Sequence, residues 1–134
     1  MSQENVEIVR EAVEAFNGGN FEAAIDRLDP NVEWRPPDVF PDAGLYRGPE
    51  GVREFFATWL ETFQGLRLHL ERCVPAGDQQ VLAAMRVSGK GAESGVWVES
   101  PVFFQLFEFR DGLVIRARMF SAESDALEAA GLRE

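Results

Sequence analysis

Two aspartates are the first residues to consider for chemistry, because they lie in a stretch of unusual composition. Residues 33–51 read EWRPPDVFPDAGLYRGPEG and combine four prolines and three aromatic residues with Asp38 and Asp42. A carboxylate that swings over an apolar cavity can act as a general base, whereas an aspartate beside proline also shapes turns. Both interpretations stay open, and Asp38 is the catalytic candidate. The prolines restrict the stretch, which predicts a stiff flap over one end of a cavity.

Gln105 is the second candidate, because it is an amide on a strand that is otherwise largely apolar. Side chains alternate along the predicted strand at residues 96–109, so Phe103, Gln105 and Phe107 share one face. A buried amide needs hydrogen-bond partners. It either bonds a neighbouring side chain or water and orders the core, or it faces a cavity and donates a hydrogen bond to a ligand carbonyl.

The turn after this strand decides which residue lies opposite Gln105. A two-residue turn at 111–112 would place it opposite Arg118, whereas a three-residue turn at 110–112 would place it opposite Ala117. We expect the second register, because it leaves one apolar face with a single amide and collects Glu108 with the arginines on the other face. In that register Phe103 faces Met119, Phe107 faces Ile115, and Arg116 and Arg118 point away from the amide.

The chain has one histidine and one cysteine, His69 and Cys73, and they are too far apart to act together. They are four positions apart on a predicted strand, so they share a face but lie about 13 Å from each other. A shared metal ion and a thiol–imidazole pair are both excluded, and His69 is expected on the outer sheet face. The segment GKGAESG has no Ser or Thr after its lysine and is no phosphate loop. We expect neither a metal nor a cofactor.

Length and charge limit the class of protein. A chain of 134 residues predicts one domain over residues 1–134. The net charge of −10, from 23 acidic and 13 basic side chains, makes nucleic acid and anionic membranes poor partners. No apolar run approaches the roughly 20 residues that cross a bilayer, and no signal peptide is recognisable. Because one cysteine cannot form an internal disulfide, we expect a cytoplasmic location.

The order of helices and strands predicts an α+β fold. Helical spacing marks residues 3–19, residues 21–28 after a capping Asn20, and the segment from Pro49 to Gly65. Strands are expected at residues 31–35, 66–74, 80–88, 96–109 and 113–120. A short helix within residues 121–132, capped by Ser121 or Ser124, ends the chain. Helices first and strands afterwards predict an antiparallel meander packed against three N-terminal helices.

This order of elements and five sequence segments resemble the nuclear transport factor 2 superfamily, within it the SnoaL-like branch. The segments are AFNGGNFEAAIDRLDPNVEW, YRGPEGVREFF, GKGAESGVWVES, FEFRDGLVIRARMF and SDALEAAGL. The resemblance covers essentially the whole chain. It implies a cystatin-like fold, in which a curved antiparallel sheet wraps against the helices as a cone with an apolar pocket. Such proteins are commonly homodimers and include polyketide cyclases, ketosteroid isomerases, dehydratases and epoxide hydrolases.

The groups that a resemblance to ketosteroid isomerases would require are replaced in this chain. Trp34 stands in the place of the aspartate base, Ala12 in that of an oxyanion-hole tyrosine, and Gln105 in that of a second carboxylic acid. An indole and a methyl group cannot take a proton from carbon at neutral pH, so steroid isomerisation is disfavoured. The Asp-Arg-Asp arrangement of related epoxide hydrolases cannot be assembled either, because Arg116 and Arg118 are expected to face away.

Two functions remain open. The first is binding of a small apolar cyclic molecule, with isomerisation, cyclisation or hydration as its catalytic versions. The residues expected to contact that molecule are Trp34, Phe40, Tyr46, Trp59, Met85, Phe103, Gln105 and Met119. The second is a non-catalytic interaction module whose core is filled by its own side chains. In either case we expect a homodimer through the outer sheet face, with Phe104, Leu106, Arg116 and Arg118 at the interface.

Overall fold

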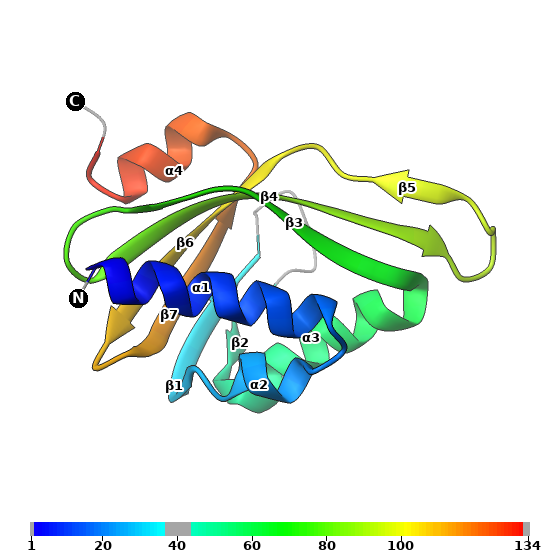
Figure 1. Ribbon diagram of the computed structural model, residues 1–134, viewed down its shortest axis with the longest axis horizontal. Coiled ribbons are helices and arrows are strands. Elements are labelled where there is room, and N and C mark those ends of the chain that lie inside the picture. The colour runs from blue at the N-terminus through cyan, green and yellow to red at the C-terminus, as the bar shows by residue number, and fades with distance from the viewer. Residues whose placement is uncertain (1, 37–43, 133–134) are drawn as a thin grey trace.

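The computed structural model describes residues 2–36 and 44–132, and it has the α+β fold expected from the order of elements (Figure 1). The helices are α1 (Ser2–Asn17), α2 (Phe21–Ile25), α3 (Gly48–Thr62) and α4 (Glu123–Ala129). The strands are β1 (Leu28–Arg35), β2 (Tyr46–Arg47), β3 (Phe63–Pro75), β4 (Gln80–Gly91), β5 (Trp97–Glu99), β6 (Phe103–Arg110) and β7 (Leu113–Phe120). In the described part of the chain no helix is long and apolar enough to cross a membrane.

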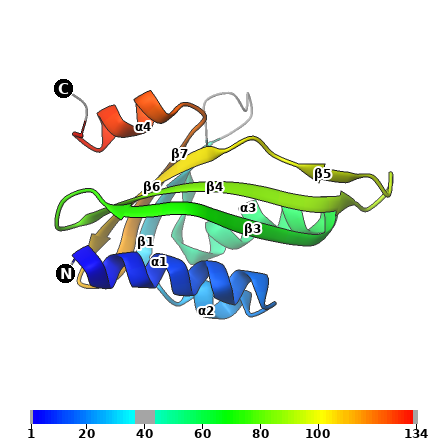
Figure 2. The ribbon, with the colours of Figure 1, turned by 45° about the horizontal axis from the view of Figure 1, so that its top comes forward.

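The strands form one curved sheet in the order β2-β1-β7-β6-β4-β3, with β5 paired to the distal half of β4. The run β3, β4, β6 and β7 is the predicted antiparallel meander. The pairing of β1 with β7 is parallel, so the first strand of the chain lies beside the last. Figure 2 shows α1, α2 and α3 against one face of this sheet, which we call the inner face, and α4 against the opposite, outer face.

The helix starts follow the expected signals in two cases and not in the third. Asn20 caps α2 by accepting a hydrogen bond from the backbone N–H of Ala23 at 3.3 Å. Pro49 lies in the first turn of α3, where its missing N–H has no cost. At α4 the prediction of a serine cap at Ser121 or Ser124 was wrong, because the capping position is Ala122 and no side chain bonds to the helix start.

The end of α1 is fastened to the edge strand β3 by one asparagine. The side-chain oxygen of Asn17 accepts from the backbone N–H of Leu68 at 2.8 Å, and its side-chain nitrogen donates to the Leu68 carbonyl at 2.9 Å. These two bonds satisfy strand groups that face no further strand. The contact fixes where the helix crosses the sheet and thereby the spacing between α1 and β3.

The expected register of the β6–β7 hairpin was wrong, although the assignment of faces was right. The turn is a two-residue turn, with positive φ at Asp111 and Gly112, as in a type I′ hairpin. A bulge after the first two residue pairs then adds one residue to β7, and Gln105 lies opposite Met119 instead of Ala117. The bulge restores the alternation that the turn would have reversed. The other pairs are Phe107 with Ala117, Leu106 with Arg118, and Glu108 with Arg116.

A second bulge corrects the prediction that His69 and Cys73 share a face. The pairing of β3 with β4 shifts between Leu70 and Arg72, so the alternation of β3 reverses between the two residues. His69 lies opposite Arg86 on the outer face, as expected for it, and its Nε2 is 2.7 Å from the Ser88 hydroxyl oxygen. Cys73 is buried on the inner face, in the core between the sheet and the helices α1, α2 and α3.

The strand expected over residues 96–109 is two strands, β5 and β6, separated at residues 100–102. Ser100 replaces a regular strand pair by bonding Val87 through both its backbone N–H, at 2.8 Å, and its side-chain oxygen, at 2.9 Å. Pro101 has no N–H to continue the ladder. As a result β5 takes the place of β6 beside β4, and β5, β4 and the first residues of β3 extend beyond the rest of the sheet as a three-stranded arm (Figure 1). Trp97 on this arm pairs with Lys90 and is 61% exposed.

The two faces of the sheet bury separate cores. The inner core contains Val9, Val32, Val52, Phe109 and neighbouring residues under α1, α2 and α3. The outer core is small and consists of Leu82, Leu106 and Ala76 packed against Ala126 of α4. Leu106 is 0% exposed within the single chain. Its expected place in a dimer interface was therefore wrong, because α4 of its own chain covers it.

Candidate functional site

A cavity of about 310 Å³ lies between the inner face of the sheet and the helices α1, α2 and α3. Its walls are formed by apolar side chains from every one of these helices and from strands β1, β3, β4, β6 and β7. The helical contributors include Ile8, Val13, Phe16, Phe21, Val52, Phe56 and Trp59. The apolar side chains of the helices do not fill the space between the helices and the sheet. A volume enclosed in this way by apolar side chains is typical of a small-molecule pocket.

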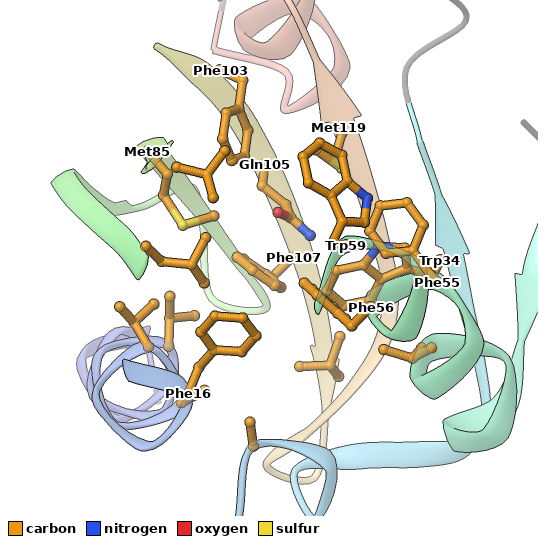
Figure 3. Close-up of a pocket in the computed structure, with 18 of the residues that line it drawn as sticks. Phe16, Trp34, Phe55, Phe56, Trp59, Met85, Phe103, Gln105, Phe107 and Met119 are labelled. Carbon is orange, nitrogen blue, oxygen red and sulfur yellow. The ribbon is translucent and has the colours of Figure 1, made fainter. Parts of the chain in front are cut away.

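Aromatic rings form the side of the cavity next to β1 and α3. The indole ring of Trp34 meets the rings of Phe55, Phe56 and Phe107 at centroid distances of 6.3, 5.6 and 6.3 Å. The contacts with Phe56 and Phe107 are edge-to-face, and Phe56 continues to Phe16 at 5.5 Å. Ring pairs of this kind hold one another in fixed orientations. The cavity therefore has a rigid aromatic wall (Figure 3).

Six of the eight residues expected to contact a ligand line this cavity. They are Trp34, Trp59, Met85, Phe103, Gln105 and Met119. Tyr46 does not line it; its ring packs against Phe55 at 5.3 Å, from the short strand β2. Phe40 lies outside the described residues, as do the two aspartates of the flap, Asp38 and Asp42.

The wall residues that sequence reasoning missed come mainly from the helices and from β3. Phe16, Phe21, Phe56, Leu66 and Leu68 all line the cavity. The helical ones carried a signal, because Val9, Val13 and Phe16 recur at helical spacing and so share one face. That spacing predicts a buried face. It does not show whether the face meets another side chain or an empty volume.

Within residues 2–36 and 44–132, two nitrogen atoms of residues in the cavity wall are buried without a hydrogen-bond partner: Nε1 of Trp34 and Nε2 of Gln105. Trp34 is 6% exposed and Gln105 is 3% exposed. Most buried polar groups in proteins have partners, so two such donors in one cavity need an explanation. Figure 3 shows the amide end of Gln105 directed into the cavity, toward the side where Trp34 and Trp59 lie.

The charged groups of β6 and β7 lie on the outer face, away from the cavity. Glu108 accepts hydrogen bonds from Arg116 and, at 3.3 Å, from Arg118. The bond to Glu108 raises the pKa of Arg116, whereas burial lowers that of Arg118. The two guanidinium groups belong to this outer network and face away from the cavity, as the sequence predicted. An Asp-Arg-Asp site inside the cavity cannot be built from them.

The cavity wall is apolar and can hold an apolar molecule. Among the described residues the wall contains no Asp, Glu or His, and its one charged residue is Arg27, which pairs with Glu11 at 3.7 Å. The described part of the chain also has no cluster of three or more potential metal ligands. A group that could take a proton from carbon is thus missing from the described wall.

Comparison with known proteins gives the family. Residues 9–117 match the family model of the SnoaL-like domain. Among curated protein sequences none matches this chain significantly.

Three solved structures illustrate the similarity in fold. Bal32a, from a soil-derived mobile gene cassette, is 24% identical with a TM-score of 0.77, and the alignment covers 96% of each chain. A putative SnoaL-like polyketide cyclase from Jannaschia sp. CCS1 is 22% identical with a TM-score of 0.76, over 99% of this chain and 94% of that one. TerC, co-crystallised with polyporic acid, is 21% identical with a TM-score of 0.76, over 96% and 98%. At these identities the likeness shows the fold.

Proposed function

Because the chain belongs to the SnoaL-like domain family, we propose that it binds a small apolar cyclic molecule between its sheet and its N-terminal helices. The observation that carries the proposal is the cavity of about 310 Å³ with its nearly complete apolar lining. Small-molecule sites are typically cavities of about this size with a few polar groups that orient the ligand. Gln105 and Trp34 supply such groups.

The aromatic rings of the cavity wall favour a flat or cyclic ligand. Trp34, Phe55, Phe56 and Phe107 present ring edges and faces that already pack against one another. A rigid ring loses little conformational freedom on binding to such a wall, whereas a flexible chain loses more. The relatives point the same way: one is a putative polyketide cyclase and another was crystallised with polyporic acid.

A catalytic version of this function needs a proton acceptor, and we propose Asp38 for that role. It lies in the flap sequence, and the described wall offers no carboxylate. An isomerisation or cyclisation at a carbon next to a carbonyl begins with removal of a proton from that carbon, and in a hydration the base takes a proton from the attacking water. If Asp38 is the base, Asp38→Asn abolishes turnover of a substrate and leaves its binding unchanged. Loss of binding together with turnover would give Asp38 a role in closing the cavity instead.

The competing function, an interaction module with a self-filled core, is less well supported because the cavity is not filled by side chains. Pairing of two chains is compatible with both functions, and we propose it through the part of the outer face that α4 leaves uncovered. That part includes Phe104, Arg116, Arg118 and the exposed Trp97. Sedimentation velocity at micromolar concentration is the test: a dimer that Trp97→Lys dissociates supports this interface, and a monomeric wild type overturns it.

Ligand binding is tested by tryptophan fluorescence in a background that removes the surface signal. Trp97 is 61% exposed and lies on the outer face, so Trp97→Phe leaves Trp34 and Trp59 at the cavity as reporters. A panel of flat apolar cyclic compounds is titrated into this variant. We expect a saturable quench or shift from at least one compound class.

A matched pair of variants separates binding in the cavity from binding to the surface. Val87→Phe fills part of the cavity, whereas Val96→Phe makes the same change at a residue that is 56% exposed. The cavity variant should weaken binding about tenfold or more, and the surface variant should leave it unchanged. No saturable response across the panel, from folded protein, would overturn the proposed function and favour the interaction module.

A further inference from the structure

A second, smaller depression of about 130 Å³ adjoins the cavity, on the inner face of the arm that β3, β4 and β5 form. We call it the arm trough, and the residues that line it without lining the cavity are Phe63, Ser88, Gly89, Val98 and Glu99. We propose that the ligand is a ring compound with an unbranched apolar chain of about four carbon atoms, whose rings lie in the cavity and whose chain lies in the arm trough. This inference rests on the proposed binding function and specifies the class of its ligand.

The cavity and the arm trough share part of their walls. Four residues line both volumes: Trp59, Leu66, Val87 and Ser100. They come from α3, β3, β4 and the segment between β5 and β6. The ring of Trp59 also stacks on that of Phe63 at a centroid distance of 6.0 Å, with 28° between the ring planes. Apolar surface therefore continues from the cavity into the arm trough, and one molecule can contact both.

The arm trough follows the central strand of the arm, because that strand carries a glycine between apolar neighbours. Gly89 of β4 lies opposite Val98 of β5, and Phe63 and Leu66 of β3 approach it from the other side. A Cβ atom at Gly89 would be 3.0 Å from the Cβ atom of Phe63, so a side chain at this position would displace that wall. Val87 is the next residue of β4 on the same face, about 7 Å away, and it lines the cavity. The arm trough therefore runs along β4 toward the cavity.

The polar side chains that line the arm trough already have partners within the chain, which favours an apolar occupant. Glu99 accepts a hydrogen bond from Arg86 at 3.0 Å. The Ser100 hydroxyl accepts from a backbone N–H at 2.9 Å and donates to a backbone carbonyl at 2.8 Å. The Ser88 hydroxyl oxygen is 2.7 Å from Nε2 of His69. A chain of methylene groups needs no hydrogen-bond partner in this place, whereas a polar chain would lose its bonds to water.

The size and the exposure of the arm trough set the length of the chain and its effect on binding. The volume of about 130 Å³ is about four times the roughly 30 Å³ that one water molecule occupies in the liquid, so it holds about four chain atoms. Full burial of one methylene group tightens binding by about fourfold. Because Val98 is 42% exposed, a chain beside it keeps one side in solvent, and we expect about twofold per carbon atom.

The test uses three compounds with the same two rings and chains of different length: 2-methylnaphthalene, 2-butylnaphthalene and 2-hexylnaphthalene. Their dissociation constants are measured by tryptophan fluorescence in the Trp97→Phe background. At about twofold per carbon atom, the butyl compound should bind about eightfold more tightly than the methyl compound. The hexyl compound should bind within about twofold of the butyl compound, because its last two carbon atoms extend beyond the arm trough.

A matched pair of variants shows whether the chain lies in the arm trough. Val98→Asp places a charge in the trough, whereas Val96→Asp places the same charge at a residue that is 56% exposed and lines neither volume. Val98→Asp should reduce the eightfold ratio to about twofold or less, and Val96→Asp should leave the ratio as it is. Because the ratio compares two compounds with the same variant, a general effect of the substitution on the cavity cancels.

Nuclear magnetic resonance locates the chain directly. Nuclear Overhauser effects should connect the terminal methyl group of bound 2-butylnaphthalene with the methyl groups of Val98. A chain that folds back into the cavity would instead show effects to Met85 or Met119, which line the cavity alone, and that result overturns the inference.

The outcomes distinguish failure of this inference from failure of the proposed function. Equal binding of the methyl and butyl compounds, a ratio that survives Val98→Asp, or an affinity that rises by the same factor per carbon atom up to hexyl overturns the chain proposal and leaves binding in the cavity standing. Failure of all three naphthalenes to bind overturns it too. A response from other compounds of the fluorescence panel then leaves the proposed function standing, whereas no response from the whole panel overturns both.

Discussion

Gln105 and Glu108 are polar residues on the same strand, β6, and they differ in their hydrogen bonding. Glu108 lies on the outer face and bonds two arginines of the neighbouring strand. Gln105 lies on the inner face and is 3% exposed, and none of the described residues accepts a hydrogen bond from its amide nitrogen. Among the described residues of the outer face, two arginine nitrogens also lack a partner, Nε of Arg86 and Nε of Arg118, but each side chain bonds a glutamate through another nitrogen.

The comparison extends to the packing of the two faces of the sheet. On the outer face Glu108 pairs with Arg116 and Arg118, and α4 packs against the apolar part. The inner face keeps an open volume and unpaired donors. A structural core gains from satisfying every buried polar group, and the proposed function would give those of the inner face a partner from outside the chain. The following changes test this contrast.

The largest effect is expected at Leu106, where the outer face is fully packed. Leu106→Ala removes a side chain that is 0% exposed and packed beneath α4, which should lower the free energy of unfolding by about 3 kcal/mol. The matched change Leu68→Ala, in the wall of the cavity, should cost only about 1 kcal/mol because that side chain already lacks neighbours on one side. Urea denaturation of both variants measures the difference, and equal losses would mean that the two faces are equally well packed.

The next effect concerns the charge on the outer face. Glu108→Gln keeps the shape of the side chain but leaves Arg116 and the partly buried Arg118 without their carboxylate, which should destabilise the protein by about 2 kcal/mol. Glu123→Gln is the control, because its pair with Arg72 is largely exposed and should contribute below about 0.5 kcal/mol. A Glu108 variant no less stable than the control would show that the outer network contributes nothing to stability.

On the inner face the loss of a polar group should raise the free energy of unfolding instead of lowering it. Gln105→Met removes the unpaired amide at nearly constant length, so the ligand-free protein should gain about 1 kcal/mol in its free energy of unfolding. The same substitution at the exposed Gln64 should change stability by less than about 0.5 kcal/mol. A destabilised Gln105→Met would indicate that the amide orders the core, the alternative that the sequence left open.

The smallest effect is expected at Cys73, which is buried in the inner core but does not line the cavity. Burial raises the pKa of this thiol, an effect that nearby Arg10 opposes and Glu7 reinforces. The unfolded chain therefore ionises first, at about pH 8.5, and the stability of wild type relative to Cys73→Ala should fall as the pH rises above that value. Denaturation of both proteins at pH 7 and pH 9.5 measures this; an unchanged difference would mean that the thiol reaches solvent in the folded state.

Much of the fold could be predicted from local patterns. Alternation along residues 103–110 and 113–120 placed Gln105 with Phe107 on one face and Glu108 with the arginines on the other, and the structure agrees. Helical spacing and the signals at Asn20 and Pro49 located the first three helices. Family membership is confirmed by the match over residues 9–117. These features follow from neighbours within a few residues along the chain, which is why one sequence contains them.

The errors have a common physical cause. The hairpin register failed because a tight turn and a bulge act together, and the bulge depends on how β7 packs beside β1 as well as β6. His69 and Cys73 were placed on one face because alternation was carried through a bulge in β3. Leu106 was assigned to a dimer interface because an apolar residue shows only that something covers it. That cover, α4, comes from a segment far along the chain.

The order of amino acids thus decides which residues form each helix or strand and which face of a strand is apolar, because 3.6- and 2-residue periods are local properties. Tertiary structure alone decides that β1 joins β7, that α4 covers part of the outer face and that a volume of about 310 Å³ stays open on the inner one. The volume depends on helix-to-sheet distances set by contacts such as that of Asn17 with Leu68, which are distant in sequence. The sequence pattern of a buried apolar face is the same whether that face contacts another side chain or a ligand.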